Sequence, residues 1–159
     1  MFRVGIGQDS HRFSQDKFKK LVLGGFEIND EPGFDANSDG DVIIHSVCNA
    51  LESAIGNKSF SVYADEMCKN GVTDSKKYLE IALEHIAEKG YGISNIAISL
   101  ECKKPKILPI HENIVNSLAS VLNIEAEKIG FTATTGEELT SFGKGLGVQS
   151  IAIVSLVKK

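Results

Sequence analysis

Apolar residues alternate with polar residues and glycines from the start of the chain. Phe2, Val4 and Ile6 stand at every second position, and this period of two predicts a β-strand at the N-terminus. The apolar runs 21–23 and 26–28 flank two glycines, which is the pattern of a short β-hairpin. Three more apolar runs predict strands at 95–100, 129–133 and 148–157.

Three segments instead have the spacing of amphipathic helices, with apolar residues three or four positions apart. The first covers about 38–56, and Ser38 or Asp39 is its expected N-cap. The other two helices are expected at about 74–90 and through 114–121. Residues 57–73 show no clear period, so no element is predicted there.

Strands that alternate with helices predict a single α/β domain over residues 1–159, with a sheet covered by helices. The last expected strand is apolar at nearly every position, as in a strand that is buried on both faces. A chain of this length can bury a sizeable hydrophobic core.

Composition narrows the function. The formal net charge is −4, so the chain has no basic surplus with which to neutralise a nucleic-acid backbone. Three cysteines without a Cys-x-x-Cys spacing indicate neither a structural zinc site nor a disulfide framework. No signal peptide pattern and no apolar run long enough to cross a bilayer is present. We therefore expect a cytoplasmic protein that binds neither nucleic acid nor membranes.

The strongest candidates for chemistry lie near the end of the first strand. Asp9 and His11 are two positions apart and so project to the same face, on which Gly5 and Gly7 leave space. On the first helix, His45 lies opposite the apolar stripe and is expected on the polar side. One carboxylate and two imidazoles, with a fourth position open, form the ligand set of a catalytic zinc site.

Each of these residues also has an ordinary structural interpretation. Asp9 could cap a turn, and His11 could lie in a polar loop. Asp39 and Asp41 could stabilise a helix N-terminus through its dipole, without any role in chemistry.

Two segments that contain glycine are candidates for phosphate binding. Residues 132–137 combine threonine hydroxyls, a glycine and a glutamate at a predicted strand end, and the same pattern fits a strand that runs into a helix N-cap. Residues 143–147 have glycine at every second position but match no nucleotide-binding fingerprint. The remaining histidines, His85 and His111, are expected at the surface.

Taken together, the order and spacing of these motifs resemble the 2-C-methyl-D-erythritol 2,4-cyclodiphosphate synthase family of the non-mevalonate isoprenoid pathway. The resemblance runs nearly from end to end. The segments that carry it are 3–11, 23–25, 38–42 with His45, 89–91, 105–109, 133–137, and 143–145 with Gly147.

The resemblance implies an α/β (α+β) fold in which a mixed sheet is packed on one face by helices. It also implies a homotrimer, with sheets around a central three-fold axis and active sites between neighbouring subunits. Asp9, His11 and His45 would hold Zn2+, and Glu137 would bind a second cation, Mg2+ or Mn2+. The implied reaction converts 4-diphosphocytidyl-2-C-methyl-D-erythritol 2-phosphate to the cyclodiphosphate and CMP, by attack of the 2-phosphate on the β-phosphorus.

The resemblance also assigns contacts with the substrate. Thr135 and Asn37 would act at the reacting centre, and Lys144 would lie near the trimer axis, where an isoprenoid diphosphate could bind. The full set of expected substrate-binding residues is Asp9, His11, Asn37, Ser38, Asn57, Asp65, Cys102, Lys103, Lys104, Pro105, Lys106, Ile107, Leu108, Thr134, Thr135, Glu137 and Lys144.

Several positions depart from the family pattern. Asn37 stands where a histidine is usual, and an amide can donate a hydrogen bond but carries no positive charge. Segments 56–59 and 63–67 replace the usual Gly-Asp-Ile-Gly and the acidic segment after it. Lys144 replaces an arginine and loses its bidentate geometry, and Leu146 replaces a glutamate. The alternatives are a divergent homologue with diphosphate phosphoesterase activity, and a non-catalytic trimer that binds a nucleotide or isoprenoid diphosphate.

Overall fold

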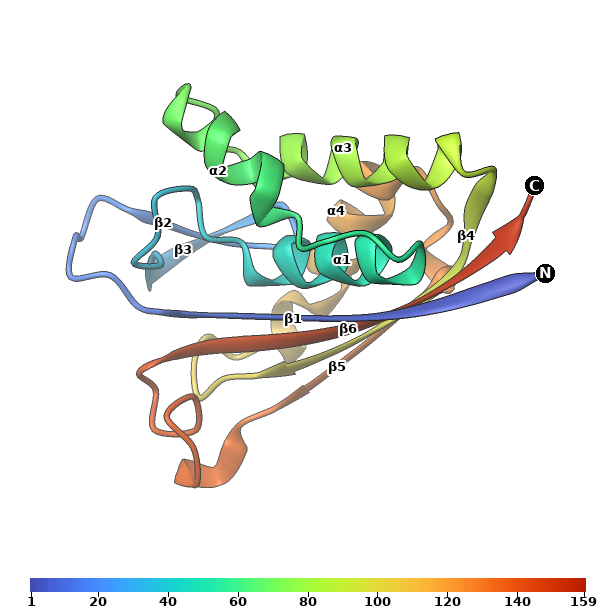
Figure 1. Ribbon diagram of the computed structural model, residues 1–159. Helices are drawn as coiled ribbons and strands as arrows, with labels where there is room; N and C mark the ends of the chain where they lie inside the picture. The colour runs from blue at the N-terminus through green and yellow to red at the C-terminus, as the bar shows by residue number, and fades with distance from the viewer.

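Four strands form the main sheet in the computed structural model, which describes residues 1–159 (Figure 1). In order across the sheet they are β1 (Phe2–Arg12), β6 (Gly147–Lys158), β4 (Tyr91–Glu101) and β5 (Ile129–Thr134). β6 is antiparallel to β1 and to β4, whereas β4 and β5 are parallel. The predicted mixed sheet is confirmed, and the C-terminal ends of β1, β4 and β5 lie at the same end of it.

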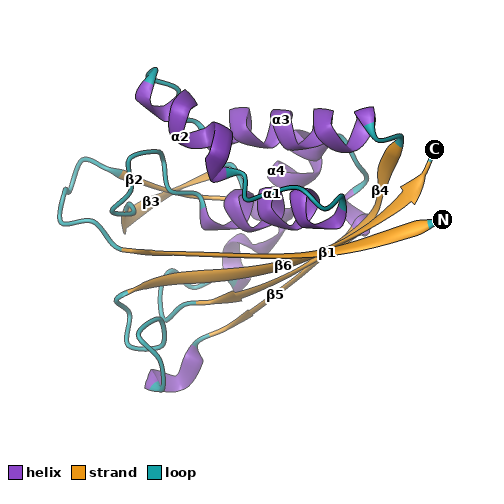
Figure 2. Ribbon diagram, in the orientation of Figure 1, coloured by secondary structure: helices purple, strands orange, loops and turns teal.

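The helices lie on one face of this sheet, as expected (Figure 2). They are α1 (Val42–Ala54), α2 (Ser61–Lys69), α3 (Ser75–Glu88) and α4 (His111–Leu122), with short 3-10 turns at Leu108–Ile110, Ala126–Lys128 and Gly136–Glu138. The predicted hairpin is also present and consists of β2 (Lys20–Leu23) and β3 (Phe26–Pro32). No helix of the fold is long and apolar enough to cross a membrane.

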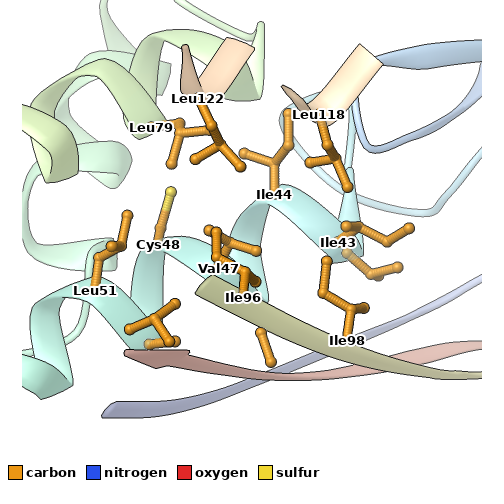
Figure 3. Packing of buried hydrophobic residues seen from close by; sticks show 14 of the residues in the cluster. Ile43, Ile44, Val47, Cys48, Leu51, Leu79, Ile96, Ile98, Leu118 and Leu122 are labelled. Carbon is orange, nitrogen blue, oxygen red and sulfur yellow. The ribbon is translucent and has the colours of Figure 1, made fainter. Parts of the chain in front are cut away.

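α1 lies at the centre of a single hydrophobic core. Figure 3 shows its side chains between β4 on one side and the helices α3 and α4 on the other. The labelled residues of α1 there are Ile43, Ile44, Val47, Cys48 and Leu51. α1 is buried almost all round, and only Asn49 and Ser53 form a narrow polar edge that reaches solvent. His45 lies outside this edge and only 5% of it is exposed, but both ring nitrogens contact polar side chains, so its position is polar and buried.

The opposite face of the sheet carries apolar side chains that nothing in the chain covers. On β6, residues that face the helices are buried and their neighbours are more exposed, so this strand is buried on one face in the single chain. The exposed apolar residues of β1 and β6 are Phe2 (72% exposed), Val4 (58%), Ile6 (61%), Ile153 (45%) and Val157 (42%). An uncovered apolar patch of this kind is typical of an interaction surface.

Two glycines allow α1 to lie directly on β1. A Cβ atom on Gly5 would lie 2.0 Å from the carbonyl oxygen of Ala50, and one on Gly7 would lie 2.1 Å from that of Ser46. Both distances are far shorter than a van der Waals contact, so only glycine permits this approach. The expectation of open space beside these glycines is wrong, because the backbone of α1 fills it.

Asp41, rather than Ser38 or Asp39, is the N-cap of α1. Its buried carboxylate accepts hydrogen bonds from the backbone N–H groups of Ile43 and Ile44, both at 3.1 Å. It also accepts from the N–H groups of Gly24 at 2.9 Å and Gly25 at 2.6 Å, in the turn between β2 and β3. One side chain therefore starts the central helix and ties the hairpin to it.

We expect the substitution Asp41→Ala to lower the free energy of unfolding by about 3 kcal/mol, because four N–H donors, three of them buried, lose their acceptor. Urea unfolding measures this as a lower midpoint with an unchanged slope. Asp74 is the matched control, since it caps α3 at a half-exposed site through one hydrogen bond to Lys76. Asp74→Ala should cost about 1 kcal/mol. Equal losses in both variants would contradict the role of Asp41.

α2 is the one helix that the sequence pattern does not reveal. It has nine residues, and only Ala64 among them is fully buried. Such a short and mostly polar helix gives almost no periodic signal. It matters for function because it forms one wall of the cavity described below.

Candidate active site

Asp9, His11 and His45 converge at the point where β1 meets α1. The Nδ1 atom of His45 lies 2.9 Å from Oδ2 of Asp9, and Nε2 of His11 lies 3.1 Å from the same oxygen. One ligand atom from each of the three residues lies within 4.8 Å of the other two. The sequence placed these residues together correctly, and the close packing of α1 on the β1 glycines is what brings His45 to the strand.

This group fits a zinc ion in its donor atoms and in its spacing. Zinc binds imidazole nitrogens and carboxylate oxygens at about 2.0–2.2 Å, which puts tetrahedral ligand atoms roughly 3–4 Å apart. Nε2 of His11 is buried, and its 3.1 Å approach to Asp9 lacks the geometry of a hydrogen bond, as expected of a nitrogen that is kept for a metal. Burial alone would raise the pKa of Asp9, but its contacts with His11 and His45 outweigh this and lower the pKa to about 2. The Asp9 carboxylate is therefore ionised and ready to bind a cation.

The three residues open into a cavity of about 840 Å³. α2 and the segment that leads into it form one wall, and the segment before α1 forms another. The cavity is lined by Asp9, His11, Asp35, Ala36, Asn37, Ser38, His45, Asn49, Ser59, Phe60, Ser61, Ala64, Asp65, Cys68, Lys69 and Tyr78. Among the expected substrate-binding residues, Asn37, Ser38 and Asp65 thus share one cavity with the metal ligands.

Asn57 lies outside this cavity, and its side chain is already engaged. Its Nδ2 donates to the buried carboxylate of Glu52 at 2.8 Å. The same carboxylate accepts from the Tyr63 hydroxyl at 3.1 Å and pairs with Nδ1 of His85 at 2.7 Å. Glu52 therefore joins α1 to α2 and α3. His85 is partly exposed, with 34% of its side chain accessible, and its ring is held by this carboxylate.

His111 likewise has a structural contact. Its Nε2 lies 3.0 Å from the backbone oxygen of Phe131, and the two rings stack at 5.3 Å. The contact holds the start of α4 to β5. Neither this histidine nor His85 approaches the metal ligands, since both are absent from the cavity lining.

The expected nucleotide-binding residues 102–108 follow β4 directly. Cys102 is buried, and burial raises its pKa to about 11, so the thiol stays protonated and donates to the backbone oxygen of Pro105. A contact from Cys102 to a ligand would have to use its backbone. Lys103 pairs with Glu138 at 2.6 Å, and Lys104 lies over the ring of Phe13 at 5.1 Å. Lys106 and Leu108 are exposed, and Pro105 and Ile107 are buried.

The expected phosphate-binding residues follow β5. Thr134, Thr135 and Glu137 are exposed, and the hydroxyl of Thr135 accepts from the N–H of Glu137 at 3.4 Å. Glu137 and Glu138 both have positive φ angles, of 45° and 64°, which are unfavourable for residues with a side chain. Strained backbone of this kind is concentrated at functional sites, which supports a role for this turn. Lys144 is exposed in the loop that leads into β6.

The metal ligands and the nucleotide segments lie apart within one chain. Across the sheet, Asp9 pairs with Ser150, Ser150 with Leu100, and Leu100 with Ala133. Three strand spacings of about 4.8 Å separate the first and last of these by roughly 14 Å. None of the residues 102–108, Thr134, Thr135 or Glu137 lines the cavity at the metal ligands. All of them nevertheless lie at the same end of the sheet.

Comparison with known proteins gives a consistent result over the whole chain. The model of the YgbB family matches residues 2–157. The chain is 42% identical over 160 residues to 2-C-methyl-D-erythritol 2,4-cyclodiphosphate synthase of Chlamydia trachomatis. The match covers 99% of this chain and 89% of that protein.

Two solved structures have the same fold. One is Plasmodium falciparum IspF in complex with CDP, with a TM-score of 0.87, 31% identity, and coverage of 99% of this chain and 97% of that one. The other is the bifunctional IspDF of Campylobacter jejuni, with a TM-score of 0.91 and 29% identity. That match covers 100% of this chain and 43% of the longer one.

Proposed function

The chain belongs to the YgbB family of 2-C-methyl-D-erythritol 2,4-cyclodiphosphate synthases, and from this premise we propose the role of each site residue in the reaction. The reaction converts 4-diphosphocytidyl-2-C-methyl-D-erythritol 2-phosphate into 2-C-methyl-D-erythritol 2,4-cyclodiphosphate and CMP, so the enzyme is a phosphorus–oxygen lyase. The observation that carries the proposal is the group of Asp9, His11 and His45 at the cavity, in a chain that matches the family from end to end.

Asp9, His11 and His45 would hold a zinc ion through one oxygen and two nitrogens. A bound zinc would act as a Lewis acid and template for a phosphate oxygen of the substrate. The protein contributes the ionised Asp9 carboxylate, the partly exposed imidazole of His11 and the buried imidazole of His45, whose positions are fixed by β1 and α1. All three residues line the cavity, so a substrate phosphate bound there could reach a zinc that they held.

Asn37 and Ser38 line the same cavity and would bind phosphate oxygens of the substrate. Both side chains donate hydrogen bonds, and such donors stabilise the charge that develops on oxygen during phosphoryl transfer. Asp65 on α2 could accept hydrogen bonds from hydroxyl groups of the methylerythritol unit. The cavity thus offers donors for phosphate at one wall and an acceptor for the polyol at the other.

Residues 102–108, Thr134 and Thr135 would bind the cytidine diphosphate part of the substrate. The CDP complex of the Plasmodium falciparum protein supports a cytidine nucleotide as the ligand. Thr135 would act at the reacting centre, and Glu137 would bind a second cation, Mg2+ or Mn2+, beside the diphosphate. An acidic side chain that is exposed on a strained turn is suited to this role, because hard cations prefer oxygen ligands.

We further propose that the active site forms between neighbouring copies of the chain in a homotrimer. The separation of roughly 14 Å between the two parts of the site within one chain supports this arrangement. The uncovered apolar face of the sheet would pack around the three-fold axis against the same face of the other copies. Lys144 would lie near this axis and could attract an isoprenoid diphosphate there.

The identity of the products tests the proposed reaction. Purified protein with zinc and magnesium is incubated with the substrate, and 31P NMR follows the phosphorus atoms. We expect CMP and the cyclic diphosphate in equal amounts, with no product after a chelator has removed the metals. CMP with a linear phosphate would instead indicate a phosphoesterase. Tight binding of CMP or CDP without turnover would indicate a nucleotide-binding protein.

A further inference from the structure

The imidazole ring of His45 makes a polar contact at each of its nitrogens. Nδ1 lies 2.9 Å from Asp9, toward the metal position, and Nε2 lies 2.7 Å from the hydroxyl oxygen of Ser75. A neutral imidazole has one N–H and one lone pair, and only the lone pair can bind a metal. A neutral His45 can therefore bind the metal through Nδ1 only if its proton is on Nε2.

Ser75 is fully buried at the start of α3 and contacts Asp39 as well as His45. The Ser75 hydroxyl donates to Oδ1 of Asp39, and its backbone N–H donates to Oδ2 of Asp39 at 3.0 Å. An ionised carboxylate can only accept hydrogen bonds. The hydroxyl proton of Ser75 is thus directed to Asp39, and its oxygen lone pairs are left to accept a hydrogen bond from Nε2–H of His45.

We propose that Ser75 and Asp39 are positioning residues that set the tautomer of His45 and so direct its Nδ1 lone pair to the metal. The inference rests on the proposed metal role of His45 and adds two residues to it. It agrees with the general rule that a metal-bound histidine donates its other N–H to a fixed partner. Neither residue touches the metal or the substrate in this account.

The aromatic neighbours of His45 cannot replace this contact. The rings of Phe60 and Tyr78 lie 4.9 Å and 6.1 Å from the His45 ring and pack against it. Packing of this kind restricts the plane of the ring but does not distinguish its two nitrogens. Only the hydroxyl of Ser75 offers an acceptor to Nε2.

The substitution Ser75→Ala tests the proposal in the metal-free, full-length protein. We expect its zinc affinity, measured by competition with a coloured chelator, to fall 10- to 100-fold. Asp39→Asn should weaken zinc binding by about tenfold, because one acceptor oxygen becomes an NH2 group. Long-range 1H–15N NMR of the zinc-loaded parent protein should find the His45 proton on Nε2, because the Nδ1 lone pair would then be used by the metal; a proton on Nδ1 in the loaded protein would overturn the proposal.

Ser46→Ala is the matched control. Ser46 is a buried serine next to His45 in the chain, but its hydroxyl contacts Ile43 and Ser150 instead of the ring. This variant should change zinc affinity by less than about threefold, while it loses a buried hydrogen bond much as Ser75→Ala does. An equal loss of zinc affinity in both serine variants would show a general packing effect and overturn the inference.

The outcomes separate this inference from the proposed function. If the parent protein binds zinc and Ser75→Ala keeps its affinity, the positioning role is wrong and the metal site stands. If the parent protein binds no zinc, the proposed metal role fails, and the positioning role, which rests on it, fails with it.

Discussion

Replacement of His45 with alanine is expected to lower the rate of CMP formation on the order of 1,000-fold or more, because the metal loses one of its three protein ligands. The ring also packs against Phe60 and Tyr78, so its removal leaves a gap in the wall of the cavity. Two measurements check this prediction: the rate of CMP release, and the zinc content per chain after gel filtration. Both should fall together.

His111→Ala is the control for this substitution. His111 is also part-buried and packs against an aromatic ring, but it lies beside β5 and outside the cavity. We expect its zinc content to remain at that of the parent protein. Full activity and one zinc per chain in His45→Ala would show that the metal assignment is wrong.

Replacement of Gly7 with alanine is expected to destabilise the whole fold. The new Cβ would lie 2.1 Å from the Ser46 carbonyl oxygen and 2.4 Å from the Ala50 nitrogen. Both are backbone atoms of α1, so the helix itself must move away from β1. We expect a loss of about 3 kcal/mol or more, which lowers the Tm of a chain of this length by roughly 10 °C. Zinc affinity should fall as well, because His45 moves away with α1.

Gly130→Ala provides the comparison. Gly130 is also a strand glycine, but a Cβ there would meet only Ile96 and Ala97 atoms at 3.8 Å and 4.0 Å, which are ordinary contacts. Thermal unfolding should therefore show little change in this variant. If Gly7→Ala melted at the temperature of Gly130→Ala and bound zinc as tightly, close helix–strand contact would not be what positions His45.

The candidate metal ligands could be brought together from the sequence because their placement depends on local geometry. Residues two apart on a strand share a face, so Asp9 and His11 had to lie side by side once the strand was recognised. His45 was also placed at this site, but its burial was not foreseen. Helical periodicity assumes a wide solvated face, whereas α1 is covered by the sheet and by other helices except at Asn49 and Ser53.

The parts of the site that sequence analysis missed depend on contacts between distant segments. Ser75 reaches His45 from α3, and Glu52 joins α1 to α2 and α3. No local pattern signals such partners. The N-cap of α1 was misplaced for a related reason: Asp41 is favoured because it also binds the turn at Gly24 and Gly25, which lies outside the helix.

The central claim is that each active site combines the metal ligands of one chain with the phosphate-binding turn of a neighbouring copy. Two inactive variants test it: His45→Ala among the metal ligands, and Thr135→Ala in the phosphate-binding turn. If the two are mixed under conditions that allow the subunits to exchange, some interfaces will contain both an intact His45 and an intact Thr135. Random mixing in equal amounts makes this true of about a quarter of the sites.

The decisive measurement is the rate of CMP release by this mixture. We predict about a quarter of the activity of the parent protein, and no recovery when His45→Ala is mixed with Asp9→Ala, because both substitutions then affect the same part of the site. A mixture of His45→Ala and Thr135→Ala that exchanges subunits and stays inactive would contradict the account, since the complete site would then lie within a single chain.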